Sequence, residues 1–170
     1  MWKKPLAITI IFYLFALLQS SFLVHFSLFG STLNLVFTLF FLLVFFENKE
    51  NIYSVIFVSA LAGFFLDIFS YANFGPSIVL MIIIGSLLKR TQIALKNTKN
   101  NYPYAYFLPL FIVSFLAYNF FINLYLNFLV SDRIVINLGI DSFILVLDDL
   151  LVASLFFYVY KKYFINKVDN

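Results

Sequence analysis

Carboxylates lie inside two long apolar stretches of this chain, where they could carry out chemistry within a membrane. Asp67 follows the run SALAGFFL, and Asp148 and Asp149 interrupt the run that begins at Ser142. Ionisable groups inside a bilayer are costly, and they often belong to catalytic pairs or to relays for protons and ions. These aspartates are therefore the first candidates for a functional site.

The catalytic motifs that the sequence lacks argue against an enzyme. Gly63 lies four residues before Asp67, which differs from the G-x-G-D spacing of intramembrane aspartyl proteases. The sequence has no G-x-S-x-G, P-loop or H-E-x-x-H motif. It has no cysteine and a single histidine, His25, so thiol chemistry, disulfides and multi-histidine metal sites are excluded. We predict no enzymatic activity, cofactor or metal, although a proton relay through Asp67 and Asp148 stays open.

The composition places the chain in a lipid bilayer. Of the 170 residues, 64% are hydrophobic and 11% are charged, and the mean hydropathy is +1.00. A soluble domain of this size cannot bury so much apolar surface. The apolar runs are continuous rather than alternating, which favours helices over a membrane barrel. We therefore predict an all-α integral membrane protein with a single polytopic domain over residues 1–170, and we expect its 25 phenylalanines mainly at lipid-facing positions.

Six apolar runs are predicted to be transmembrane helices packed into a compact bundle. Their ranges are about 5–24, 32–46, 52–70, 76–90, 103–130 and 142–160. The first run is long for a signal peptide and no A-x-A-like cleavage site follows it, so we expect it to be retained. Gly75 and Pro76 signal a turn and the start of a helix. We expect the other helices to pack around the pair formed by the third and fourth runs.

The basic residues indicate the orientation of these spans. With six spans, ten of the eleven Lys and Arg residues fall on the side that holds both termini, and Arg133 alone falls on the other. The positive-inside rule then places both termini in the cytoplasm. Topology and contact with anionic lipid explain the net charge of +3, so we predict membrane lipid and not nucleic acid as a partner.

The third run carries three residues whose spacing predicts a helix–helix contact. Ser59, Gly63 and Asp67 occur at i, i+4 and i+8, so they share one helix face. Small residues let a neighbouring helix approach closely. We therefore expect Asp67 to point at a neighbouring helix rather than at lipid.

Other polar residues fall in the same half of the predicted bundle, away from the cytoplasm. Asn119, Asn123 and Asn127 are spaced four apart, so they share one helix face. Asp148 and Asp149 lie about two turns from the outer end of the last span. They could hold helices together, line a groove for another protein's helix or form a small-molecule pocket. The residues predicted to form this partner-binding or buried polar cluster are Ser59, Gly63, Asp67, Ser70, Gly75, Pro76, Asn119, Asn123, Asn127, Asp148 and Asp149.

One segment resembles a known family. The stretch GFFLDIFS from Gly63 to Ser70, with Gly75 four residues further on, is similar to the G-x-x-L-D-L-x-S-x4-G signature of the MreD family of rod shape-determining membrane proteins. The ending Leu17-Leu18-Gln19 of the first run and the sequence Leu33-Asn34-Leu35 also resemble that family.

The resemblance implies a non-catalytic scaffold in the bacterial cytoplasmic (inner) membrane. Members of the family bind the bitopic protein MreC in the cell-elongation machinery, which synthesises peptidoglycan. They work there with the actin-like MreB, the glycosyltransferase RodA and a class B penicillin-binding transpeptidase. Their fold is thought to be similar to the substrate-binding subunit of energy-coupling-factor transporters.

A vitamin-binding subunit of such a transporter is the alternative function. Those subunits carry an A-x-x-x-A motif on the first helix, whereas Ala7 and Ala16 are nine residues apart here. Their ligand pocket also draws on long outer loops, and the outer loops expected here are short. Both features favour the scaffold.

Overall fold

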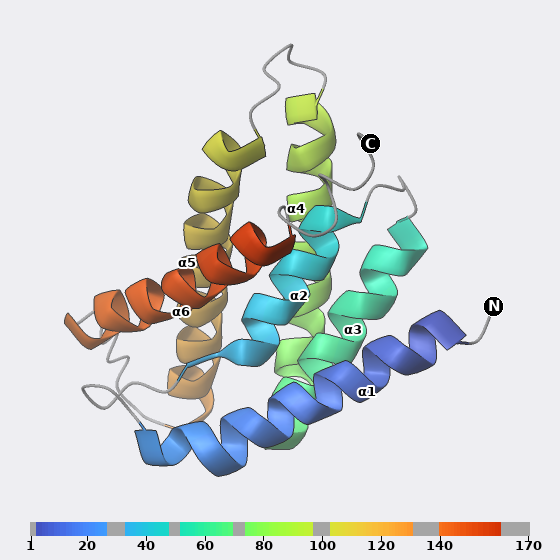
Figure 1. Cartoon of the computed structure of the whole chain (residues 1–170). Coiled ribbons are helices and arrows are strands. Elements are labelled where there is room, and N and C mark those ends of the chain that lie inside the picture. The colour runs from blue at the N-terminus through green and yellow to red at the C-terminus, as the bar shows by residue number, and fades with distance from the viewer. Residues whose placement is uncertain are drawn as a thin grey trace.

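The computed structural model describes residues 3–26, 33–47, 52–69, 74–96, 103–130 and 140–160, and every regular element in these ranges is helical (Figure 1). The α-helices are α1 (Lys3–Leu17), α2 (Leu35–Phe46), α3 (Ile52–Phe69), α4 (Pro76–Lys96), α5 (Pro103–Val130) and α6 (Ile140–Tyr160). A π-helical turn (Leu18–Phe22) and a 3-10 turn (Leu23–Phe26) follow α1. The predicted all-α class is confirmed for this part of the chain.

Four of the described segments are long and apolar enough to cross a membrane: Lys3–Phe22, Ile52–Phe69, Pro76–Leu95 and Tyr106–Phe128. The chain therefore has the helices of a membrane protein, and the arrangement with six spans stays a prediction. At 12 residues, α2 is much shorter. It is about 18 Å long, whereas the hydrocarbon core of a bilayer is about 30 Å thick.

Two helix boundaries differ from the sequence-based expectation. The second helix begins at Leu35 rather than 32, because the Asn34 side chain caps it. The fourth was expected to end at 90 but continues to Lys96. The polar residues after Leu88 were expected to lie in solvent and end the helix. Two of them, Lys89 and Gln92, are buried instead, and the helix continues through them.

The centre of the fold is α2, which contacts every other α-helix. Nine of its 12 residues are buried. In Figure 1, α1 and α6 slant across one face of the molecule and α2 lies between them. As expected, α1, α2 and α5 pack on the pair formed by α3 and α4, whereas α6 packs mainly on α2 and α5. Because α2 is apolar on all sides, its sequence fits burial in protein and contact with lipid equally well.

Phenylalanines form much of the core. Those on α2 and α5 follow each other four residues apart, so each helix presents a row of rings. The rings meet edge to face with centroids 5.2, 5.0 and 5.2 Å apart in the pairs Phe37–Phe115, Phe41–Phe111 and Phe45–Phe107. Among the described phenylalanines, ten are buried and eight are exposed, so the expectation that these rings mainly face lipid was wrong.

Candidate functional site

Asp67 caps the helix that follows its own. Its side chain is 3% exposed, and its two carboxylate oxygens accept the backbone N–H groups of Gly75 (2.8 Å) and Ser77 (3.1 Å). The first N–H groups of a helix have no partner within that helix, and the helix dipole favours a negative charge there. The carboxylate of α3 therefore fixes the start of α4.

The turn between these helices has the predicted form. Gly75 has φ +122°, a conformation that favours glycine, and Pro76 is the first residue of α4. The Ser77 hydroxyl lies 3.2 Å from the Tyr118 hydroxyl of α5, which connects the capped end of α4 to a third helix. Ser70, the remaining residue of the predicted motif, lies outside the described residues.

Small residues bring the backbones of α3 and α4 together at two levels. A Cβ atom on Gly63 would lie 2.4 Å from Cα of Ile78. A Cβ atom on Gly85 would lie 2.2 Å from Oγ of Ser59. The face formed by Ser59, Gly63 and Asp67 is therefore buried between two helices of this chain, and its residues hold α3 against α4.

A second group of polar side chains surrounds the start of α2. Asn34 Oδ1 accepts the N–H of Phe37 (3.0 Å), and Gln19 Oε1 accepts the N–H of Val36 (3.2 Å). Asp149 Oδ1 accepts the N–H of Asn34 (2.9 Å). Residues from the turn after α1 and from α6, together with Asn34 just before α2, therefore satisfy backbone donors at this helix end.

The two aspartates of α6 have different surroundings. Asp149 is fully buried, whereas Asp148 is only half-buried, as expected for neighbours that point about 100° apart on a helix. Asp149 Oδ2 and Thr38 Oγ1 are both buried and have no hydrogen-bond partner among the described residues.

The asparagine row of α5 begins at Asn119, next to Tyr118, whose hydroxyl lies 3.2 Å from that of Ser77. Asn119 donates to the carbonyl of Phe115 in its own helix (3.0 Å). Asn123 is exposed and Asn127 is half-buried. The residues predicted to form one cluster therefore occupy three settings: the start of α4, the start of α2 and the surface of α5.

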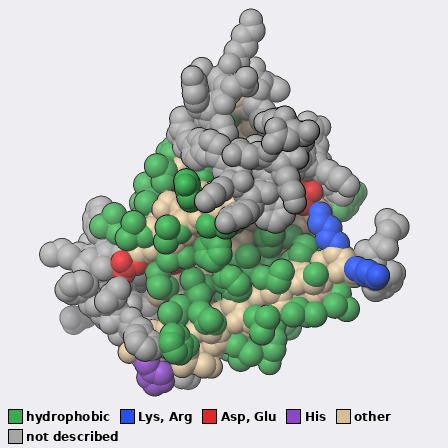
Figure 2. All heavy atoms as spheres, viewed as in Figure 1, with side chains coloured by type: hydrophobic (Ala, Val, Ile, Leu, Met, Phe, Trp, Pro, Cys, Tyr) green, Lys and Arg blue, Asp and Glu red, His purple; other side chains and the backbone are tan. Residues whose placement is uncertain are grey.

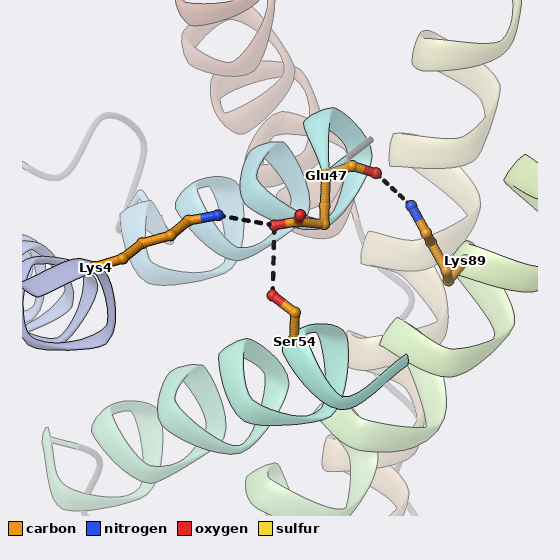
Figure 3. A network of polar contacts seen from close by, with 4 residues as sticks. All are labelled: Lys4, Glu47, Ser54 and Lys89. Carbon is orange, nitrogen blue, oxygen red and sulfur yellow. Dashed lines mark hydrogen bonds and ion pairs between the residues drawn. The ribbon is translucent and has the colours of Figure 1, made fainter. Parts of the chain in front are cut away.

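A third polar group surrounds the C-terminal end of the helix α2, and we call it the C-terminal cluster after that helix end (Figure 3). The Glu47 carboxylate lies 3.6 Å from the Lys4 ammonium and accepts a hydrogen bond from the Ser54 hydroxyl (3.4 Å). The Lys89 ammonium donates to the backbone carbonyl of Glu47. Lys4, Ser54 and Lys89 come from α1, α3 and α4, so this cluster joins four segments of the chain.

The end of α2 is capped from α4. Gln92 Nε2 donates to the carbonyl of Phe45, and Lys89 Nζ donates to Gln92 Oε1 (3.2 Å). The last carbonyls of a helix lack partners within it and favour a nearby cation. Lys89 is only 3% exposed, so this cation is buried against the helix end.

This cap was not predicted from the sequence. Two signals could have revealed it: Lys89 and Gln92 are spaced i, i+3 at the end of an apolar run, and the second apolar run is short for a membrane span. Backbone groups at the ends of a short helix need partners from the protein, because hydrocarbon offers none.

Replacing Lys89 by Met is expected to reduce the free energy of unfolding by roughly 1–2 kcal/mol, because the backbone carbonyl of Glu47 and the side-chain oxygen of Gln92 lose a donor. Denaturant unfolding in detergent, followed by far-UV circular dichroism, measures the change. Arg90→Met is the matched control, since Arg90 is exposed at the next position of α4. Equal stability of the two variants would contradict the cap.

The described residues contain no group of three or more His, Cys, Asp or Glu side chains that could hold a metal ion. The buried aspartates Asp67 and Asp149 accept backbone N–H groups at helix starts. Their observed contacts are those of structural caps.

A comparison of the chain with known protein families, curated proteins and solved structures found no match. The resemblance to the MreD family therefore stays a prediction.

Proposed function

We propose that this chain is a non-catalytic scaffold of the MreD type, located in the bacterial cytoplasmic membrane, and that it binds MreC in the cell-elongation machinery. The observation that carries the proposal is the part played by the motif that resembles the family. Gly63 permits the close contact of α3 and α4, Asp67 caps α4, and Gly75 makes the turn between them. A motif whose residues build a helical hairpin fits a scaffold better than an enzyme.

The arrangement of the charges supports the proposed orientation. Lys4 and Lys89 lie in the C-terminal cluster, so the start of α1 and the second half of α4 are at the same end of the molecule (Figure 3). We call this the basic end. In the proposal the basic end and both termini face the cytoplasm, in accord with the positive-inside rule.

The surface of α5 towards its C-terminal end is the proposed contact for MreC. Asn123 is exposed there beside the exposed side chains of Phe120, Phe121 and Leu124. An amide that faces lipid is stabilised when a neighbouring helix forms a hydrogen bond with it. Ser59, Gly63 and Asp67 are buried between α3 and α4, so in the proposal they do not touch the partner.

Cross-linking tests this contact, and the absence of cysteine from the chain removes any background. We expect Asn123→Cys to form a disulfide with a cysteine placed near the outer end of the MreC transmembrane segment, when the two proteins are produced together. Leu14→Cys is the control, because Leu14 is 56% exposed on α1. Equal cross-linking from both positions, or cross-linking from Leu14→Cys alone, would refute the proposed surface.

The alternative function, a vitamin-binding transporter subunit, predicts a different result. Such a subunit would retain a small-molecule ligand through purification, and mass spectrometry of the purified protein would detect it. RodA, the class B penicillin-binding transpeptidase and MreB are proposed as members of the wider complex, without an assigned surface on this chain.

A further inference from the structure

An apolar groove with a volume of about 410 Å³ lies over α2, between α1 and α6. Leu39, Leu43 and Phe46 of α2 line it, together with Ile8 of α1 and Phe156 of α6. Figure 2 shows the apolar surface of this side of the molecule, with basic (blue) and acidic (red) side chains close together at its right margin. Lys4 and Glu47 also line the groove, so it reaches the basic end.

The groove follows from how the helices cross. Leu39, Leu43 and Phe46 are spaced i, i+4 and i+7, so they form one stripe along α2. The helices α1 and α6 slant across this side of α2 (Figure 1) and contact it without covering the whole stripe. An empty apolar groove forfeits the dispersion contacts of the atoms that line it. In a membrane, an apolar molecule is therefore expected to fill it.

The size of the groove favours a thin occupant. A helix with its side chains is about 10 Å across, so 410 Å³ corresponds to roughly one helical turn. A whole transmembrane helix of a partner is therefore much larger than the groove. An acyl chain is much thinner, and the volume lies within the range of roughly 300–1,000 Å³ that is typical of small-molecule sites.

The charges at the mouth of the groove select the headgroup. Lys4 has a side chain that is 70% exposed, and the neighbouring Lys3 is also exposed. Glu47 is the acidic residue that lines the groove, and it is 17% exposed, lies 3.6 Å from the Lys4 ammonium and accepts a hydrogen bond from Ser54. It offsets the charge of Lys4, so the excess positive charge at this end comes from the neighbouring Lys3. Accessible positive charge therefore exceeds accessible negative charge, which favours a phosphate that carries a net negative charge.

We propose that the groove binds an anionic phospholipid, with one acyl chain along Leu39, Leu43 and Phe46 and the phosphate at Lys4. This site does not depend on the resemblance to MreD or on the contact with MreC. The bound chain completes the cover of α2, the central helix of the fold.

Photo-cross-linking of the full-length protein tests the site. The protein is placed in phosphatidylcholine vesicles that contain a small fraction of phosphatidylglycerol with a photoreactive acyl chain, and adducts are mapped by peptide mass spectrometry. We expect adducts on α2, several-fold more than with photoreactive phosphatidylcholine at the same fraction. Lys4→Gln should reduce them several-fold, whereas Arg90→Gln, which removes an exposed positive charge outside the groove, should not.

A filling substitution gives an independent test. Leu43→Trp should reduce the α2 adducts several-fold, and Leu108→Trp, at a 43% exposed position on α5, should leave them unchanged. Val159→Trp serves the same purpose if Leu43→Trp does not fold, because Val159 is exposed and also lines the groove. Adducts spread evenly over the lipid-facing helices, or equal labelling by the two lipids, would overturn the proposal.

Discussion

Replacing Asp67 by Leu should destabilise the protein by roughly 3–5 kcal/mol, because a buried and a half-buried N–H group at the start of α4 lose a charged acceptor. Both N–H groups bond to this carboxylate, at Gly75 and Ser77. A leucine side chain offers no acceptor in place of the carboxylate. Denaturant unfolding of the purified protein in detergent measures the change, with far-UV circular dichroism as the signal.

Two further variants make the Asp67 result interpretable. Asp67→Asn keeps one acceptor oxygen, so its stability should lie between those of the wild type and Asp67→Leu. Asp148→Leu is the control for removing a carboxylate from an apolar helix, because Asp148 is half-buried. Wild-type stability of Asp67→Leu would show that the cap contributes nothing.

Replacing Gly63 by Val should cost about 3 kcal/mol, because a side chain at this position overpacks a close helix contact. The new Cβ atom would lie 2.4 Å from Cα of Ile78 and 2.7 Å from the carbonyl oxygen of Ser77. These are backbone atoms, so α3 and α4 must separate, and the hydrogen bonds of Asp67 would lengthen with them. The same unfolding experiment measures the loss.

The sign of the change in the free energy of unfolding of Gly63→Ala shows whether crowding at this contact outweighs the higher helix propensity of alanine. Alanine is favoured over glycine inside a helix by about 1 kcal/mol, so an uncrowded site would gain stability. At Gly63 we expect a loss instead. Ala60→Val is the matched control for a β-branched residue in α3, because Ala60 is only half-buried. A gain in stability for Gly63→Ala would contradict the close contact.

Local features of the fold were predictable from the sequence. Apolar runs with polar or turn-forming residues between them gave helices close to their observed ranges, as for α3 and α5. The turn at Gly75 and Pro76 has a direct steric signature. The i, i+4, i+8 spacing of Ser59, Gly63 and Asp67 placed them on one face, and that face packs against α4.

The arrangement of the helices was less predictable. The sequence LVFTLFFLLVFF of α2 is apolar on every side, so it carries no signal that distinguishes a central helix from one in lipid. The positions of Asp149 and Lys89 at opposite ends of α2 depend on contacts across 115 and 42 residues. Such pairings require the tertiary fold, whereas spacing within one segment shows only which residues share a face.

The shortness of α2 has a consequence for how the protein enters the membrane. A segment of 12 apolar residues is shorter than the roughly 20 that span a bilayer independently. Gln19 and Asn34, which are made before it, satisfy two N–H groups at its start, but its other end contacts come from side chains that are made later, on α4 and α6. We therefore expect α2 to reach its final position only after these downstream segments have been made.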